Sequence, residues 1–183
     1  MSELSIPNED SGKYPLGMVN QVVNMVDDIN SFPDPAEPIL GQTDEVVMAA
    51  NLKDLILRPR TILVTLQEDK TVLGFSLAVP VNVMDPSRES ESHQTAYIYY
   101  SAISPARQGE GLIRPLMNDM FIKLQSAGYS YVERDAQIGN GYADNIEASY
   151  PKEAILQSFE HEPWPEHGRL RHMRMDLDKA LSA

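Results

Sequence analysis

The sequence predicts a single α/β domain in which helices cover both faces of a mixed, mostly antiparallel central sheet. Three observations support this. Residues 95–103 are rich in Tyr and Ile and free of charge, which is typical of a strand. A glycine-bearing turn follows, and then apolar residues at helical spacing predict a helix that ends near Gly128. Residues 60–66 and 71–83 predict a hairpin. Residues 169–177 alternate in polarity and predict a last strand.

Two helices are expected before the hairpin. Pro15 opens the first, because apolar side chains recur every three or four residues after it. Residues 31–42 carry three prolines and predict a loop. Thr43 or Asp44 caps the second helix, which ends before Pro59.

The remaining segments are assigned by the same rules. Residues 84–94 are charged and Ser-rich and predict an exposed loop. Residues 129–137 predict a strand, 142–149 a short helix, and 152–158 a continuation with helical character. Residues 159–164 are expected to be extended.

Composition narrows the class of protein. The 183 residues suit one domain, 1–183, of which residues 1–14 are polar and expected to be flexible. Cysteine is absent, so disulfides and a thiol nucleophile are excluded, and we predict no metal. The net charge of −12 disfavours binding to nucleic acid. It is compatible with a cationic substrate, or with an acidic surface that only keeps the protein soluble. No signal-peptide pattern or run of ~18 apolar residues is present, so we expect a cytoplasmic protein with no membrane contact.

The turn at residues 104–111 has the chemistry of an anion site. The first N–H groups of a helix lack partners, and the helix dipole places partial positive charge there. Gly109 and Gly111 carry no Cβ to hold a phosphate away, and Arg107 and Arg114 flank the turn. No Lys-Ser or Lys-Thr follows Gly111, and the glycine spacing is not the dinucleotide fingerprint.

The stretch 105–113 resembles the acetyl-CoA loop of the GNAT (GCN5-related) N-acetyltransferases, whose pattern is Gln/Arg-x-x-Gly-x-Gly/Ala. Gln108 takes the first place and Gly111 the glycine. Ile113 departs from the pattern, which prefers Gly or Ala there. Glu110 is a second departure, because a carboxylate near a pyrophosphate is unfavourable unless it points to solvent.

The resemblance implies the GNAT fold, in which the fourth and fifth strands run parallel and splay apart to admit acetyl-CoA. By resemblance, the backbone of Ala102 and Ile103 pairs with the pantetheine arm, Ile103 donates to the oxyanion, and an amine attacks the thioester directly. The implied cofactor-binding residues are Ala102, Ile103, Arg107, Gln108, Gly109, Glu110, Gly111, Leu112, Ile113 and Asn140.

The catalytic assignments rest on the same resemblance. The family's thiolate donor is a Tyr in an Asn-x-x-Ala-x-x-x-Tyr pattern that this chain does not reproduce, so Tyr150 is favoured over Tyr142, with simple packing as its alternative. Glu133 is expected to be the base, on one strand face with Asp135. Its alternative role is an ion pair with a nearby arginine, Arg134 or Arg171.

The sequence therefore predicts an acetyl-CoA-dependent N-acetyltransferase that acts on a small-molecule or peptide amine. A GNAT-fold module that binds CoA for regulation or interaction, with little or no turnover, is the alternative. A third possibility is a mixed α/β protein without a CoA site. The last strand, residues 169–177, is expected at or near a sheet edge, and a homodimer through this region is expected.

Overall fold

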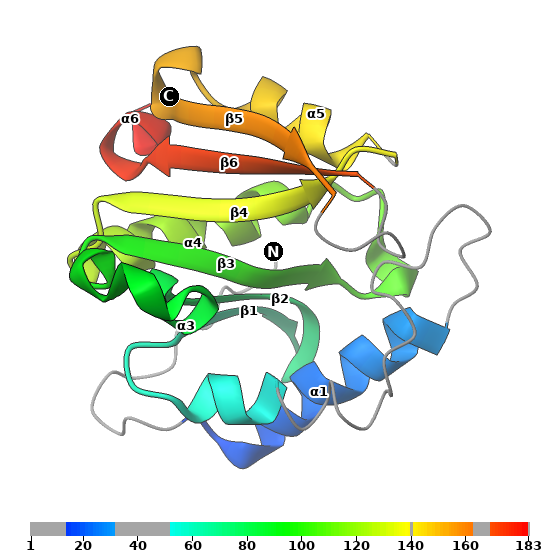
Figure 1. The fold of residues 1–183 in the computed structure, drawn as a ribbon. Helices are drawn as coiled ribbons and strands as arrows, with labels where there is room; N and C mark the ends of the chain where they lie inside the picture. Colours follow the sequence, from blue (N-terminus) through cyan, green and yellow to red (C-terminus); the bar gives the residue numbers. More distant parts are fainter. Residues whose placement is uncertain (1–13, 32–51, 140, 163–168, 183) are drawn as a thin grey trace.

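The computed structural model describes residues 14–31, 52–139, 141–162 and 169–182. In these ranges, six strands form one sheet in the order β1-β2-β3-β4-β6-β5 (Figure 1). All neighbouring strands are antiparallel except β3 and β4, which are parallel. The strand bounds are β1 Ile62–Glu68, β2 Thr71–Pro80, β3 Thr95–Ile103, β4 Tyr131–Gln137, β5 Ile155–His161 and β6 Leu170–Asp176. The predicted mixed α/β fold is confirmed.

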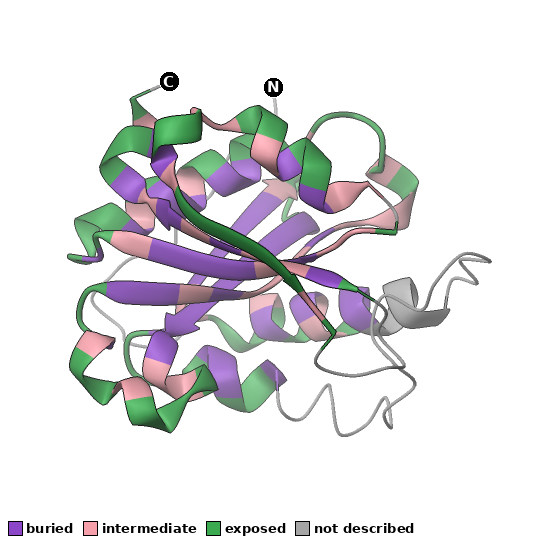
Figure 2. Ribbon diagram, turned by 45° about the horizontal axis from the view of Figure 1, so that its top comes forward, coloured by how far each residue is buried: buried purple, intermediate pink, exposed green. Residues whose placement is uncertain are grey.

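Helices cover both faces of the sheet, and the helices on one face pack over a different hydrophobic core from those on the other face. On one face, α1 (Leu16–Ser31) and the helical residues 52–57 pack over β1 and β2, where Val19, Val22 and Phe75 are fully buried (Figure 1). On the other face lie α4 (Ile113–Ser126), α5 (Tyr142–Ser149) and α6 (Leu177–Leu181). Figure 2 shows the central strands buried between the two layers. No helix in the described ranges is long and apolar enough to cross a membrane.

Local turn chemistry explains two of these elements. Asp69 and Lys70 have φ values of 49° and 68°, so they form the two-residue turn with both central φ angles positive that suits a twisted hairpin. At the end of α4, Gly128 adopts φ 90°. The N–H of Tyr129 donates to the carbonyl of Leu124, and that of Gly128 to Gln125, both at 3.0 Å, which closes the helix at the predicted glycine.

Some expected elements were wrong because pairing between distant segments overrides local pattern. Residues 81–84 form a helical turn, α3 (Val81–Met84), so the second hairpin strand ends at Pro80. The expected loop 84–94 contains η2 (Pro86–Glu91). Residues 152–158, expected to be helical, form η4 (Lys152–Ala154) and most of β5.

The last strand lies near a sheet edge, as expected. β6 lies between β4 and β5, so it is the strand next to the edge that β5 forms, and β1 forms the opposite edge. The side chains of Leu156 and Phe159 on β5 are 47% and 44% exposed. A homodimer stays a prediction, and next to the last strand the edge open to a second copy is that of β5.

Candidate active site

The parallel strands β3 and β4 pair only briefly and then diverge. Three residue pairs join them, of which Tyr97 with Glu133 is the last. Beyond that pair, β3 continues along β2 to Ile103, and β4 continues along β6 to Gln137. A gap therefore opens between residues 98–103 and 134–137, with the backbone edge of β3 facing it.

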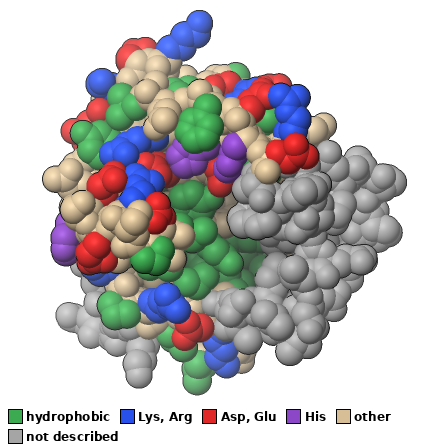
Figure 3. Space-filling view, in the orientation of Figure 1, with side chains coloured by type: hydrophobic (Ala, Val, Ile, Leu, Met, Phe, Trp, Pro, Cys, Tyr) green, Lys and Arg blue, Asp and Glu red, His purple; other side chains and the backbone are tan. Residues whose placement is uncertain are grey.

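A bulge in β3 shapes one face of this gap. Leu77 pairs with Tyr100 and Ala78 with Ile98, so Tyr99 is an extra residue in β3. As a result Tyr99 and Tyr100 both pack on the α1 side. The Tyr100 ring stacks on Phe75 at 5.6 Å, and burial raises the pKa of Tyr100 to about 12. Figure 3 shows apolar side chains lining a hollow on this face, with histidine side chains at its margin.

At the wide end of the gap lies the glycine turn that precedes α4. Gly109 and Gly111 have φ values of 82° and 74°, and an added Cβ at either would meet nothing within 4 Å. Glycine is therefore required at both positions by the positive φ of the backbone, and not by lack of space inside the protein. The Gln108 amide donates to the carbonyl of Ile103 at 3.3 Å, which ties the turn to the end of β3.

Arg107 does not stand free beside the turn. Its Nε donates to Glu110 at 2.7 Å and its Nη1 to Glu68 at 2.8 Å. The hydrogen bond from Arg107 lowers the pKa of Glu110, so the carboxylate that departs from the family pattern is neutralised locally. Of the two flanking arginines, Arg114 is the one that no carboxylate within the described residues binds.

The other residues implied by the resemblance surround the same turn. Ala102 is buried on the α1 side, whereas Ile103, Leu112 and Ile113 are half-buried against the core under α4. Asn140 lies outside the described residues.

Glu133 lies at the narrow end of the gap and is enclosed, with only 2% of the residue exposed. Both its oxygens accept from Arg88 of η2, at 2.7 and 2.9 Å, and Oε1 also accepts from Arg174 of β6 at 3.0 Å. A carboxylate held by two guanidinium groups is poorly placed to accept a substrate proton. The sequence predicted Arg134 or Arg171 as its partner, but the arginines that bind it are Arg88 and Arg174, which the fold brings from elsewhere in the chain. His172 Nε2 also lies 3.6 Å from Oε2 of Glu133.

Asp135, two residues further on the same strand face, is the more accessible carboxylate. The Tyr97 hydroxyl donates to its Oδ2 at 2.7 Å, and Oδ1 lies 2.9 Å from His172 Nδ1 and 3.1 Å from His161 Nε2. Burial raises the pKa of Asp135, but the hydrogen bonds from His172 and Tyr97 outweigh it and hold the pKa below its ordinary value. His161 is the more exposed histidine, at 31% of its side chain against 15% for His172.

This cluster of one aspartate and two histidines was missed by the sequence analysis. Asp135 pairs with His172 across β4 and β6, and Phe159 pairs with His172 across β6 and β5. The Phe159 ring packs against both histidines, at 5.7 Å from His161 and 5.0 Å from His172. These residues are brought together only by the order of the strands, so no local pattern in the sequence predicts the cluster.

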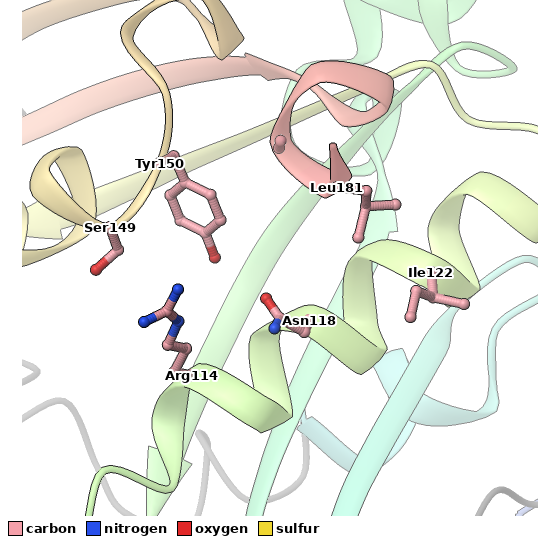
Figure 4. Close-up of a pocket in the computed structure, with 7 residues that line it drawn as sticks. Arg114, Asn118, Ile122, Ser149, Tyr150 and Leu181 are labelled. Carbon is pink, nitrogen blue, oxygen red and sulfur yellow. The ribbon is translucent and has the colours of Figure 1, made fainter. Parts of the chain in front are cut away.

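The two candidate phenols lie on the other side of the sheet. Tyr150 stacks on Phe121 at 5.2 Å, and its hydroxyl points toward Arg114 and Asn118 in a pocket of about 190 Å³ (Figure 4). The pocket is lined by Arg114, Asn118, Ile122, Ser149, Tyr150, Ala180 and Leu181. Burial raises the pKa of Tyr150 despite the opposing charge of Arg134. Tyr142 instead accepts a hydrogen bond from Arg134 Nη2 at 2.8 Å, beside the strand gap.

Comparisons with known proteins agree with this geometry. Among solved structures, yncA of Salmonella typhimurium with its cofactor acetyl-CoA is 13% identical, with a TM-score of 0.62 over 97% of this chain and 95% of that one. An N-acetyltransferase from Staphylococcus aureus Mu50 is 14% identical, with a TM-score of 0.60 over 97% and 98%. The spermidine/spermine N-acetyltransferase SpeG of Vibrio cholerae is 13% identical, with a TM-score of 0.63 over 92% and 94%.

At these identities the three structures establish the shared fold alone. No curated protein sequence matches the chain. The sequence model of the Acetyltransferase (GNAT) family, however, matches residues 24–144, which is well over half of the 183 residues. The chain therefore belongs to the GNAT family of acetyltransferases.

Proposed function

We propose that the protein is an acetyl-CoA-dependent N-acetyltransferase that transfers the acetyl group to a primary amine by direct attack. The observation that carries this proposal is the gap between β3 and β4, which opens after three residue pairs beside a turn with two left-handed glycines. The turn and the first N–H groups of α4 suit a pyrophosphate. The open edge of β3, including Ala102 and Ile103, suits the amides of a pantetheine arm.

The narrow end of the gap supplies backbone donors for the oxyanion that forms during acyl transfer. A bulge leaves its extra residue outside the strand ladder, so the N–H groups of β3 beside Tyr99 can donate to the developing oxyanion. In this proposal they take the role that the resemblance gave to Ile103, because they lie nearer to the last β3–β4 pair.

The proton of the ammonium group needs an acceptor, since a free alkylamine is mostly charged at neutral pH. We assign this role to His161, oriented by Asp135, because His161 is the more exposed member of the cluster. Asp135 stays ionised and holds the ring with Nε2–H toward itself, which leaves Nδ1 as the basic nitrogen. Glu133, whose oxygens are taken by Arg88 and Arg174, is given an anchoring role.

A second candidate function is a CoA-binding module without turnover. It is favoured by Glu110, by the engagement of Arg107 with two carboxylates, and by the absence of the family's tyrosine pattern. Titration calorimetry with acetyl-CoA tests the binding that both functions share. A panel of amines, with polyamines first because SpeG is a spermidine/spermine N-acetyltransferase, tests turnover. Thiol release is a clean readout here because the chain has no cysteine.

The loop assignment has a matched pair of variants. Gly111→Val should abolish acetyl-CoA binding, because the side chain forces the turn out of its φ of 74° and blocks the approach of a phosphate. Gly128→Val introduces similar strain at φ 90° but at the opposite end of α4, so it should lower stability and leave binding intact. Unchanged affinity in folded Gly111→Val would remove the loop from the binding site.

A further inference from the structure

A buried arginine that the proposed function has not used lies on the α4 side of the strand gap. Arg134 of β4 is only 4% exposed. Its Nη2 donates to the Tyr142 hydroxyl at 2.8 Å, its guanidinium carbon lies 5.1 Å from the centre of the Tyr142 ring, and Nη1 contacts the sulfur of Met117 at 3.9 Å. Its Nε has no hydrogen-bond partner within the described residues. None of these contacts carries a negative charge.

The acidic side chains of α5 and the one that precedes Arg134 in β4 bind other arginines. Asp144 and Glu147 of α5 both accept from Arg171 of β6, at 2.6 and 2.7 Å. Glu133, the preceding residue in β4, faces the opposite side of the sheet and binds Arg88. Arginine stays protonated in proteins, and burying a cation without a counter-ion is costly. The site is therefore arranged for an anion that is supplied from outside the described residues.

The position of the guanidinium identifies which anion fits. Arg134 follows Glu133, the last residue of β4 that pairs with β3. The sulfur of Met117 in α4 contacts both Arg134 and, at 3.6 Å, the Ser101 hydroxyl of β3. The backbone of Arg134 thus lies at the narrow end of the gap, and its guanidinium lies against Met117, which also contacts β3 across the gap. The glycine turn is at the far end, beyond Ile103, roughly 17 Å along the strand from Ile98 at ~3.3 Å per residue.

Resting on the proposed function, we infer that the Arg134 guanidinium binds the sulfur atom of the acyl donor and stabilises the thiolate that leaves. The phosphates of the donor belong to the glycine turn, and an extended pantetheine arm bridges the distance between that turn and Arg134. The sulfur is then the part of the donor that lies at the narrow end and that becomes anionic during the reaction.

Acyl transfer at this site removes two protons from the nitrogen and breaks the C–S bond of the thioester. The ammonium group gives one proton to His161, and the neutral nitrogen attacks the thioester carbonyl, which forms the C–N bond and an oxyanion. When the carbonyl re-forms, the C–S bond breaks and its electron pair goes to sulfur as a thiolate beside Arg134. The thiolate takes up a proton from a phenol or water, the second proton of the nitrogen restores that donor, and His161 releases the first proton to solvent. The products are the amide, CoA thiol and one released proton.

The phenols around Arg134 are suited to that last proton. The titratable and charged groups that face it are Tyr142 and Tyr150, with Arg114 of α4 further away, whereas the Tyr97 hydroxyl binds Asp135 on the opposite face of the sheet. Burial raises the pKa of Tyr150, so this phenol is protonated at neutral pH. Arg134 therefore supplies charge, and a phenol supplies the proton.

The direct test is the titration of the thiol of bound CoA, followed by the ultraviolet absorbance of its thiolate with desulfo-CoA as the blank. The protein has no cysteine, so any thiolate signal belongs to CoA. In the wild type, the bound thiol should titrate at least ~1 pH unit lower than in Arg134→Met, with Arg134→Lys between the two. Turnover of Arg134→Met should fall ~100-fold, with the acetyl-CoA dissociation constant changed less than about threefold.

Controls separate this inference from simpler causes. Arg114→Met removes the arginine that lines the pocket beside Tyr150 and, with CoA kept saturating because Arg114 also flanks the glycine turn, should leave the thiol titration unchanged. If Arg134→Met does not fold, the titration of Arg134→Lys against the wild type decides the question. Equal titration of bound CoA in the wild type and the Arg134 variants would overturn the inference.

Two further outcomes also count against it. A wild-type preference for succinyl-CoA over acetyl-CoA that Arg134→Met loses would show that the guanidinium binds an acyl carboxylate instead. Failure of the wild type to bind CoA in calorimetry would overturn the proposed function and this inference together, whereas CoA binding with unchanged titration would overturn only the inference.

Discussion

Replacing Glu133 by Gln distinguishes an anchoring residue from a base. The substitution keeps the shape of the side chain but removes the charge that Arg88 and Arg174 both contact. Removing one partner of a buried ion pair costs ~3–5 kcal/mol. The two guanidinium side chains are about a quarter exposed, at 25% and 24%, and both retain Glu91 as a partner. The lower end, ~3 kcal/mol, is therefore expected.

The assay is urea unfolding followed by circular dichroism, with turnover measured on the same preparations. A loss of ~3 kcal/mol in a domain of this size lowers Tm by roughly 6–12 °C. Turnover per folded molecule should stay within about threefold of the wild type, because the proposed base is His161. Glu91→Gln is the matched control: Glu91 binds the same two arginines but is 38% exposed, so its loss should cost only ~0.5 kcal/mol.

The double variant Glu133→Gln/Arg88→Met checks the physical cause. If the cost arises from an unpaired guanidinium, removing Arg88 as well should recover part of the lost free energy of unfolding. An unfolding midpoint like that of the wild type, combined with turnover lowered ~100-fold, would refute the anchoring role and return Glu133 to the reaction.

Two other predictions concern acid stability and the leaving group. Hydrogen bonds from Arg88 and then Arg174 lower the pKa of Glu91 to about 2, so its ionised form stabilises the fold fully above the unfolded value near ~4.3 and loses that contribution as the pH falls toward 2. Because Glu91 is 38% exposed, Glu91→Gln should flatten the dependence of the unfolding free energy on pH between 4.5 and ~2 by only about 0.5 kcal/mol, and a slope like that of the wild type would contradict the ion pair. Tyr150→Phe should slow turnover ~10-fold or more without weakening acetyl-CoA if Tyr150 supplies the proton; wild-type rates would mean that it only packs on Phe121.

Local patterns in the sequence specify several elements of the fold. The strand 95–103, the glycine turn, the helix closed by Gly128 and the short helix 142–149 are all formed as predicted. Each depends on residues within a few positions of one another: side-chain periodicity, a proline, or a glycine with positive φ. The family resemblance on residues 105–113 rests on the same kind of local pattern.

The assembly of the candidate site depends on contacts between segments that are far apart in the chain. Glu133 is bound by Arg88, 45 residues away in a segment expected to be an exposed loop. Asp135 meets His172 and His161 because β6 lies between β4 and β5, an order that the last strand's alternation does not reveal. Strand pairing joins backbone groups that are far apart in the chain, and its register is fixed by the whole sheet. The physical reason is that a local pattern specifies which face of a strand is buried, but not which strand lies beside it.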